Sequence, residues 1–412
     1  MASQQFADLT TLQGLTKRVY SNTFERLWPD GAILQKEIPF ASSEAIGERY
    51  VQGVQLTKAH GLTIAPSSST PVLNAAVTSK TAQALVDGTQ SILRDRISYV
   101  AASRILKSKN PERALKSGTG TVVETLRLSH IDKLEVLMLY GQMGLATVAS
   151  TSGGTDVVIT ASEWAPGIWV GSEDMPIDVY NGAVKVGTFT VASVNFDTRT
   201  LTLNTNAGIV AGYTLYYAGS FGGEFAGIHK ILSNTGSLFN IDASQYALWK
   251  STSYGFGSGA ATFAKLLSAN SRARSRGQRG KIKVLVSPAT FVDMVDSIEQ
   301  KRDFSGSGPA AYNPNQVKVG TESIQVYAPT GVMEIVVHDM VKAGYIYGLM
   351  MDTWKRIGST DTTFEIPGRS GEYWWDLQEV AALEIRSFAD WAPFCVRPAA
   401  QFLGTGIVNT NG

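Results

Sequence analysis

Apolar residues recur along the chain with different spacings, and each spacing predicts a different kind of segment. Near the start, Phe6, Leu9 and Leu12 lie three residues apart, which predicts a short amphipathic helix before the breaker PDG at 29–31. We therefore expect residues 1–35 to form an N-terminal arm that packs on something else.

Residues 36–87 show no helical period and consist mainly of Ser, Thr, Ala and Gly with scattered Val and Leu. The stretch SSEAIGERYVQGVQLTKAHGLTIAPSSSTP predicts an extended hairpin or a long projecting loop. So long a polar loop is uncommon in a compact domain unless it has a role outside its own core. Contact with a neighbouring subunit would supply that role.

Two helices are predicted next. The segment SILRDRISYVAASRILKS (91–108) has helical patterning, and a second helix follows the small-residue hinge SGTGT. Thr121 and Glu124 resemble a capping box at its start, and we expect this helix to reach about Gly141. Its apolar residues recur at three- and four-residue steps and are Val123, Leu126, Leu134, Leu137 and Met138.

Residues 149–223 change to short β-rich runs separated by Gly, Asn and Asp turns. The runs are DVVITA, GIWVG, PIDVY, KVGTFTVASV, TLTLN and YTLYYAG, and they predict a small β-barrel or sandwich inserted into a mixed parent domain. Between 150 and 225, only Lys185 and Arg199 balance seven acidic residues, which are Asp156, Glu163, Glu173, Asp174, Asp178, Asp197 and Glu224. The insertion is therefore acidic.

The remainder alternates between helix and strand. TFAKLLSANSRARSR predicts a helix, KIKVLVS a buried strand, and PATFVDMVDSIEQK a helix with proline in its first turn. Further strands are IQVYAP, MEIVVHD and EVAALEIRSFADW, whereas the final GTGIVNTNG is too polar and glycine-rich to be expected to be ordered. The predicted fold class is α+β with an all-β insertion domain.

Composition narrows the possible environments. The 412 residues carry a formal net charge of +1, so no global field drives the chain onto nucleic acid or an anionic membrane. The single cysteine, Cys395, excludes an internal disulfide and fits a reducing compartment such as a bacterial cytoplasm. The sequence shows neither a signal peptide nor eighteen consecutive apolar residues, so we expect no secretion and no membrane partner.

No sequence pattern indicates a catalytic residue, a cofactor site or a metal site. The histidines His60, His130, His229 and His338 are far apart and lack a second ligand type at metal-site spacing. Glycine-rich pieces such as GFGSGA are not followed by Lys-Ser/Thr, so they are interpreted as hinges and turns. The chain is predicted not to be an enzyme and to use no cofactor.

One basic cluster is a candidate contact site. Seven Lys and Arg residues fall between 265 and 283, almost without acids, and are Lys265, Arg272, Arg274, Arg276, Arg279, Lys281 and Lys283. They could contact phosphate or a neighbouring subunit's acids. A solvated face or an intersubunit role is favoured over DNA contact, because no aromatic residues interleave as stacking platforms.

The order of these segments resembles the major capsid proteins of tailed double-stranded DNA bacteriophages, which share the Hong-Kong-97-type fold. In that family a two-stranded extended loop reaches over the adjacent subunit, and KEIPFASSEAIGERYVQGVQLTKAHGLTIA resembles it, with Glu48, Arg49 and Lys58 as candidate contacts. The helix 121–141 resembles the family's spine helix, and KIKVLVSPATFVDMV resembles the strand and helix of its axial domain.

The resemblance implies a division of the whole chain. The parts are an N-terminal arm (1–35), an extended loop (36–87), a peripheral domain with the spine helix (88–148), the β-rich insertion (149–223), an axial domain (224–355), and a return to the peripheral domain with a C-terminal tail (356–412). The acidic insertion would face away from packaged DNA. The covalent Lys to Asn crosslink found in one branch of the family cannot be mapped onto this sequence.

The resemblance also implies partners. They are copies of this chain in pentamers and hexamers, a separate scaffolding protein, a portal, a possible decoration protein and packaged double-stranded DNA, in a virion capsid assembled in the bacterial cytoplasm. One alternative is a cellular nanocompartment shell of the same fold. Another is a carbohydrate-binding, tail-associated β protein that uses some of the eight tryptophans.

Overall fold

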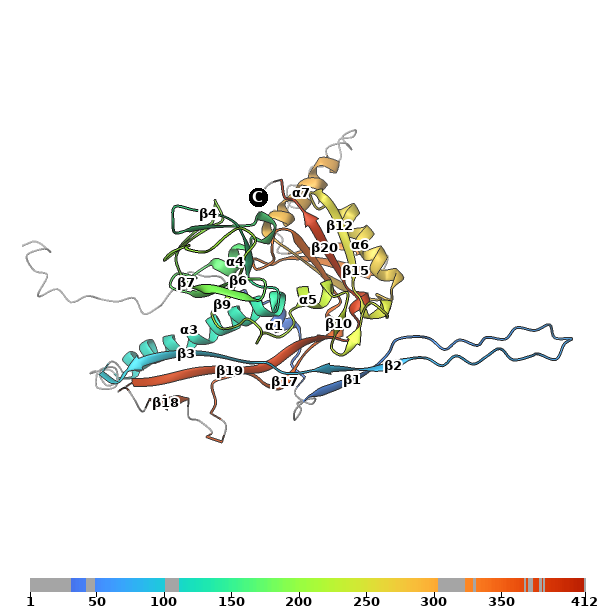
Figure 1. Cartoon of the computed structure of the whole chain (residues 1–412), viewed down its shortest axis with the longest axis horizontal. Helices are drawn as coiled ribbons and strands as arrows, with labels where there is room; N and C mark the ends of the chain where they lie inside the picture. Colours follow the sequence, from blue (N-terminus) through green and yellow to red (C-terminus); the bar gives the residue numbers. More distant parts are fainter. Residues whose placement is uncertain are drawn as a thin grey trace, which may run out of the picture.

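A long helix, α3 (Pro111–Tyr140), runs between a β-sheet on one side and a β-barrel on the other (Figure 1). Its 30 residues make it about 45 Å long. The computed structural model describes residues 31–41, 49–100, 111–302, 323–328, 331–366, 368–369, 373–377, 380 and 382–410, without the side chains of 111–122, 297–302 and 323–328. The predicted N-terminal helix and most of the arm lie outside these residues.

The predicted start of α3 is wrong. The helix begins at Pro111 and includes the SGTGT segment, so Thr121 and Glu124 form no capping box, and Glu124 instead pairs with Arg127 at 2.9 Å. Each glycine costs about 1 kcal/mol relative to alanine in a helix. Burial of side chains such as Leu134 and Met138, at about 1.5–3 kcal/mol each, exceeds that cost.

The sheet beside α3 is built around its longest strand, β19 (Ala382–Cys395). On one side β19 pairs with β3 (Gln90–Ser98), and on the other with β17 (Trp354–Thr363) and β18 (Trp374–Asp376). The prediction of a helix at 91–108 is therefore wrong for its first part. Nine consecutive pairs, from Gln90 opposite Asp390 to Ser98 opposite Ala382, hold this segment as a strand.

A closed six-stranded barrel follows α3 in the chain, with the strand order β4-β5-β8-β7-β6-β9. Its interior is filled by buried aliphatic side chains such as Val157, Ile177 and Leu201. GIWVG, predicted as a β run, instead contains the short helix α4 (Pro166–Trp169), with proline in its first turn. The strands are β4 (Ala146–Ser152), β5 (Asp156–Ile159), β6 (Pro176–Asn181), β7 (Val184–Asn195), β8 (Thr200–Leu203) and β9 (Thr214–Tyr217).

A second unit contains a six-stranded mixed sheet, ordered β12-β20-β16-β13-β15-β14, with helices α6 (Phe263–Ser275) and α7 (Pro288–Arg302). Its own apolar core includes Leu266, Val284 and Ile335. The predicted strand and proline-led helix at 281–301 are confirmed as β13 and α7. The strands are β12 (Thr252–Gly259), β13 (Ile282–Val286), β14 (Ser323–Ala328), β15 (Gly331–Val337), β16 (Tyr345–Leu349) and β20 (Phe402–Ile407).

The C-terminal tail is ordered as far as residue 410, contrary to the prediction. β20 pairs in parallel with β12 and in antiparallel with β16, so its glycines lie inside the second sheet rather than beside the first. Gly404 is required there, because a Cβ at this position would lie 2.7 Å from the Phe256 ring. Beyond the strand, Thr410 donates two hydrogen bonds of 2.9 Å to the Asp293 carboxylate of α7.

The chain before the sheet forms a hairpin of β1 (Tyr50–Gln55) and β2 (Thr81–Val86) that projects far from the body (Figure 1). The preceding residues belong to the core instead, since Leu34 and Ile38 are fully buried. The projecting part is thus shorter than the predicted loop. The remaining elements are α1 (Leu34–Glu37), α5 (Ile228–Ser233), β10 (Ser237–Leu238), β11 (Ile241–Asp242) and the 3-10 turns at 161–163, 247–249, 351–353 and 398–400.

Candidate interaction surfaces

The hairpin leaves the body shortly after β1. At its base, Leu56 is buried and the Arg49 guanidinium makes two hydrogen bonds, of 2.6 and 3.0 Å, to the Asp87 carboxylate. Farther out the two arms stay paired, since His60 and Val77 exchange two backbone hydrogen bonds of 2.8 Å. The tip turns at Pro66, whose carbonyl accepts the Ser69 N–H.

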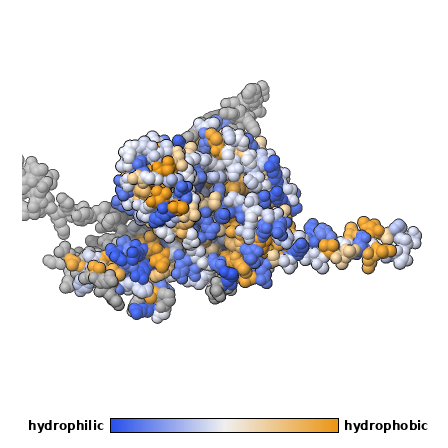
Figure 2. Space-filling view, in the orientation of Figure 1, coloured by the Kyte–Doolittle hydropathy of each residue, from blue (hydrophilic) through white to orange (hydrophobic). Residues whose placement is uncertain are grey.

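The outer hairpin carries apolar side chains that its own subunit does not cover. Leu62, Ile64, Val72 and Leu73 are between 79% and 87% exposed, and Figure 2 shows apolar surface along this projection. Isolated exposed apolar residues are ordinary, but a group on one thin projection indicates a surface that another molecule covers. Of the predicted contacts, Arg49 is tied to Asp87, Lys58 is exposed, and Glu48 lies outside the described residues.

The basic cluster does not form a single site. Lys265 donates to the Phe256 and Ala260 carbonyl oxygens at 2.8 and 3.1 Å, near the start of α6. Lys283 pairs with Glu37, and the Lys281 ammonium lies 2.7 Å from the Glu334 carboxylate and lowers its pKa. Lys265 and Lys283 therefore serve local structure, whereas the Lys281 side chain stays 61% exposed beside Glu334.

Four exposed arginines remain around the end of α6. Arg272 stacks on the Tyr254 ring at 4.8 Å, while Arg276 and Arg279 donate to the carbonyls of Ser251 and Arg274, each at 3.1 Å. Neither these three arginines nor Arg274 makes an ion pair with a carboxylate of the described residues. Cations there are favoured by the helix dipole, and their remaining N–H groups face solvent.

A second arginine group, on β3 and β19, was missed by the sequence interpretation. Arg94, Arg96 and Arg386 surround the fully buried Glu384 side chain, with its carboxylate 2.7 Å from Arg96 and 2.5 Å from Arg386. Burial alone would raise the pKa of Glu384, but the hydrogen bonds from Arg96 and Arg386 lower it. The alternation Arg94-x-Arg96 would have been the signal, had this segment been recognised as a strand.

Some acidic residues of the barrel are hydrogen-bonded within the subunit, and others are exposed to solvent. Asp178 is buried and bonded to Lys185, Thr188 and Gly219; burial would raise its pKa, but these hydrogen bonds lower it. Glu163 accepts from Thr147 and Lys342, and Glu224 accepts from the Gln142 N–H and the Ser220 hydroxyl. The exposed acids of this part are Glu173, Asp174 and Asp197.

A buried polar group joins α3, the barrel and the second sheet. The Lys342 ammonium donates to the Gly144 carbonyl at 3.1 Å and lies 4.4 Å from the centre of the Tyr140 ring. Burial lowers the pKa of Lys342, and Glu163 partly opposes that shift. Nearby, His229 bonds to the Tyr347 hydroxyl at 2.8 Å, and burial lowers its pKa to about 4. With so little access to solvent, the group is suited to joining the three parts rather than to catalysis.

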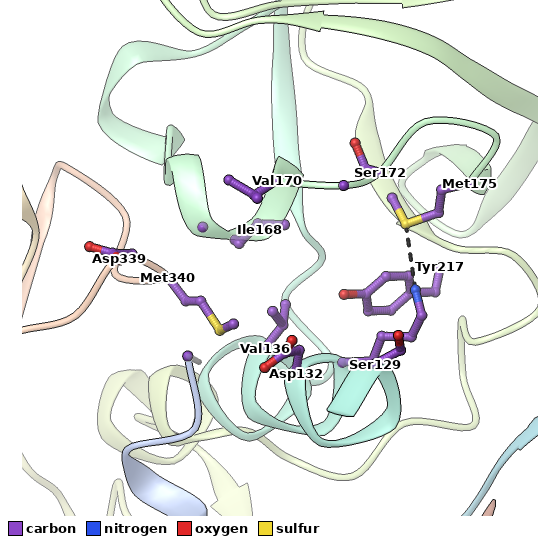
Figure 3. Close-up of a pocket in the computed structure, with 14 residues that line it drawn as sticks. Ser129, Asp132, Val136, Ile168, Val170, Ser172, Met175, Tyr217, Asp339 and Met340 are labelled. Carbon is purple, nitrogen blue, oxygen red and sulfur yellow. Dashed lines mark hydrogen bonds between the residues drawn. The ribbon is translucent and has the colours of Figure 1, made fainter. Parts of the chain in front are cut away.

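One pocket of about 160 Å³ lies between α3 and the barrel (Figure 3). Apolar side chains such as Val136, Ile168 and Met340 line much of it. Its lysine, Lys133, reaches the Met175 sulfur at 3.8 Å and faces the Tyr217 ring, and burial lowers its pKa. These residues include no nucleophile hydrogen-bonded to a base, the arrangement that acyl transfer would need.

The cysteine and the possible metal ligands also show no arrangement for catalysis in the described residues. Burial raises the pKa of Cys395 to about 12, so its thiol stays protonated at neutral pH. Across the described residues, no group of three His, Cys, Asp or Glu side chains could hold a metal ion. Nor does any helix in the described ranges have the length and apolar character needed to span a bilayer.

Solved structures with similar folds match nearly the whole chain. A chain of the Cyanophage A-1(L) capsid asymmetric unit superposes with a TM-score of 0.57 at 11% identity, covering 97% of this chain and 99% of that one. This chain has the Hong-Kong-97-type fold. A chain from the capsid of the native GTA particle has a TM-score of 0.53 at 7% identity, with 98% and 100% covered, and one from Mycobacterium phage Adephagia has 0.50 at 10%, with 99% and 100% covered. No protein-family model and no curated protein matches this sequence.

Proposed function

We propose that this protein is a major capsid protein, which assembles into the pentamers and hexamers of an icosahedral shell around double-stranded DNA. The observation that carries the proposal is the projecting hairpin, whose apolar outer part is exposed in a single subunit. Its four most exposed aliphatic side chains would each gain about 1.5–3 kcal/mol on burial. A neighbouring copy would provide that burial. The role is structural, without catalysis.

The parts of the fold suit a shell subunit. The hairpin is the proposed extended loop, α3 with the β3–β17–β18–β19 sheet the proposed peripheral domain, and the second sheet with α6 and α7 the proposed axial domain. The barrel at 146–217 is the proposed insertion domain. β20 pairs with β12 and β16, so this proposal assigns residues 402–407 to the axial domain.

Closure into a shell follows from repeated contacts between different surfaces of identical copies. Such contacts close into rings when the rotation between copies permits, and contacts between rings then close a sphere instead of growing a filament. Each contact can be weak, because multivalency raises the total affinity. We propose that Glu48, Arg49 and Lys58 at the hairpin and Arg272, Arg274, Arg276, Arg279 and Lys281 near α6 contribute contacts between copies.

Further partners follow from the same proposal. They are a separate scaffolding protein, a portal and possibly a decoration protein, in a virion assembled in the bacterial cytoplasm. The carbohydrate-binding alternative is weakened because Trp169, Trp354 and Trp391 are almost completely buried in the core. Sugar binding would need aromatic rings that are exposed to solvent.

Sedimentation of the purified full-length chain, followed by nuclease treatment of any particles, tests the proposal. A capsid protein is expected to sediment as capsomers or shells, and particles from infected cells are expected to hold nuclease-protected DNA. A stable monomer or trimer at high protein concentration would contradict it. Shells that protect only protein cargo would instead identify the nanocompartment alternative.

A further inference from the structure

The arginine group on β3 and β19 occupies one face of a β-ladder. Arg96 lies opposite Glu384, which lies opposite Trp375, and Arg94 lies opposite Arg386. Directly paired residues, and those two apart along a strand, share a face of a sheet. The three arginines and Trp375 therefore form one surface, which we call the arginine face (Arg94, Arg96, Arg386, Trp375). The opposite face carries Ser91 and Ser387, which bond to His130 of α3.

The arginine face is held in a fixed arrangement with unused donors. Arg96 and Arg386 both direct their Nε atoms at Glu384, and the Arg386 guanidinium lies 4.5 Å above the Trp375 ring. Each guanidinium has five N–H donors, so the Nη groups remain available. The Arg94, Arg96 and Arg386 side chains are 61%, 51% and 30% exposed, whereas Glu384 is fully buried beneath them. Three cations against one buried carboxylate leave a positive surface.

The position of this face complements the acidic barrel. α3 contacts the sheet through His130 and the barrel through Lys133, which reaches Met175 and Tyr217. The arginine face points away from α3, because the opposite face of the sheet bonds to His130, and the barrel lies on the other side of the helix (Figure 1). A shell around DNA gains from a positive inner surface and an acidic outer one.

We propose that the arginine face lies on the inner surface of the shell and binds the phosphate backbone of the packaged duplex. This inference rests on the proposed function and adds its DNA-facing side. Guanidinium forks match phosphate oxygens, and residues two apart on a strand repeat about every 6.8 Å, giving a row of donors rather than a single point. Contacts to phosphate oxygens carry no sequence information, so the proposed binding is independent of DNA sequence.

Binding of the full-length subunit to a fluorescent 30-base-pair duplex, measured by anisotropy over a series of salt concentrations, tests the proposal. The variant Arg94→Gln leaves Glu384 bonded to Arg96 and Arg386. It is expected to weaken binding and to reduce the slope of log K against log salt by about 1. A second variant, Arg94→Gln/Arg96→Gln/Arg386→Gln/Glu384→Gln, avoids a buried unpaired charge and is expected to reduce the slope by up to about 3.

The matched control is Arg397→Gln, which removes one exposed cation outside the arginine face and is expected to leave DNA affinity within about twofold. Unchanged affinity and slope in both arginine-face variants would overturn the proposal, as would loss of binding in the control alone. Loss of shell formation by Arg94→Gln with unchanged DNA binding would also overturn it, making this face a contact between copies. Failure of the wild-type chain to assemble would contradict the proposed function instead, whatever the DNA-binding measurement gives.

Discussion

Glu135 links three segments that are distant in the sequence. Its buried carboxylate accepts the backbone N–H groups of Ile33, Leu34 and Gln35 at 3.0, 2.6 and 3.1 Å, and the His338 Nε2 lies 3.1 Å away. The Met340 N–H donates to His338 Nδ1, so Nε2 carries the proton that bonds to Glu135. One side chain of α3 therefore secures both α1 and the end of β15.

Glu135→Gln should destabilise the subunit by about 2–3 kcal/mol, because the amide nitrogen cannot accept a backbone N–H and hydrogen bonds to a charged group are lost. Chemical denaturation followed by tryptophan fluorescence measures the change. Glu124→Gln, an exposed position on the same helix, is the matched control and should cost no more than about 0.5 kcal/mol. Equal effects of the two substitutions would contradict the role given to Glu135.

Two buried histidines predict an acid-sensitive subunit. Burial lowers the pKa of His130 and of His229 from 6.5 to about 4. Between these values the unfolded chain binds protons that the folded chain does not, so the free energy of unfolding falls as the pH drops from 6.5 towards 4. The slope is at most about 1.4 kcal/mol per pH unit for each histidine.

Unfolding measured between about pH 7 and 5, above the range in which most carboxylates titrate, isolates this effect. His130→Gln/His229→Gln should flatten the slope, even if it lowers stability at every pH. His60→Gln, on the exposed hairpin, is the control and should keep the wild-type slope. A double variant that is as pH-sensitive as the wild type would refute this assignment.

At the scale of elements, the hairpin should contribute to assembly but little to the fold of one subunit. The variant Leu62→Ser/Ile64→Ser/Val72→Ser/Leu73→Ser removes exposed apolar groups that their own subunit does not bury. Its free energy of unfolding should therefore stay within about 0.5 kcal/mol of the wild-type value. Shells or capsomers should be lost, or their dissociation constant, measured by sedimentation, should rise at least tenfold. Normal assembly of this variant would argue against the hairpin as the intersubunit contact. Leu56→Ser, at the buried base, is the contrasting variant that should lower stability itself.

The elements also show how far the sequence could predict this fold. β13 and α7 were predictable because an apolar run followed by Ser-Pro fixes a strand end and a helix start locally. β3 was not, since its strand form depends on pairing with β19, almost three hundred residues later. The same distance hid the arginine face, whose Arg96 and Glu384 are separated by 288 positions. Contacts between distant strands leave no local spacing to detect.

At the scale of the whole molecule, the arginines around α6 test whether several surfaces cooperate in assembly. Arg274→Ser/Arg276→Ser/Arg279→Ser removes cations that pair with no described carboxylate, so folding should be retained. If these arginines contact the acids of another copy, shell yield should fall several-fold, and more so at low salt, where such contacts are strongest. Sedimentation at two ionic strengths measures this. If the variant gave the wild-type yield of shells at both ionic strengths, these arginines would be a solvated face without a role in assembly.

The proposed shell depends on neighbouring copies covering residues 57–80, which a single subunit leaves open. Cryo-electron microscopy of particles purified after expression of the full chain tests that dependence most directly. We predict closed shells in which Leu62, Ile64, Val72 and Leu73 of each hairpin lie against the body of an adjacent copy. Particles in which the hairpin folds back onto its own subunit, or a chain that remains monomeric with this segment buried in its own core, would contradict the account.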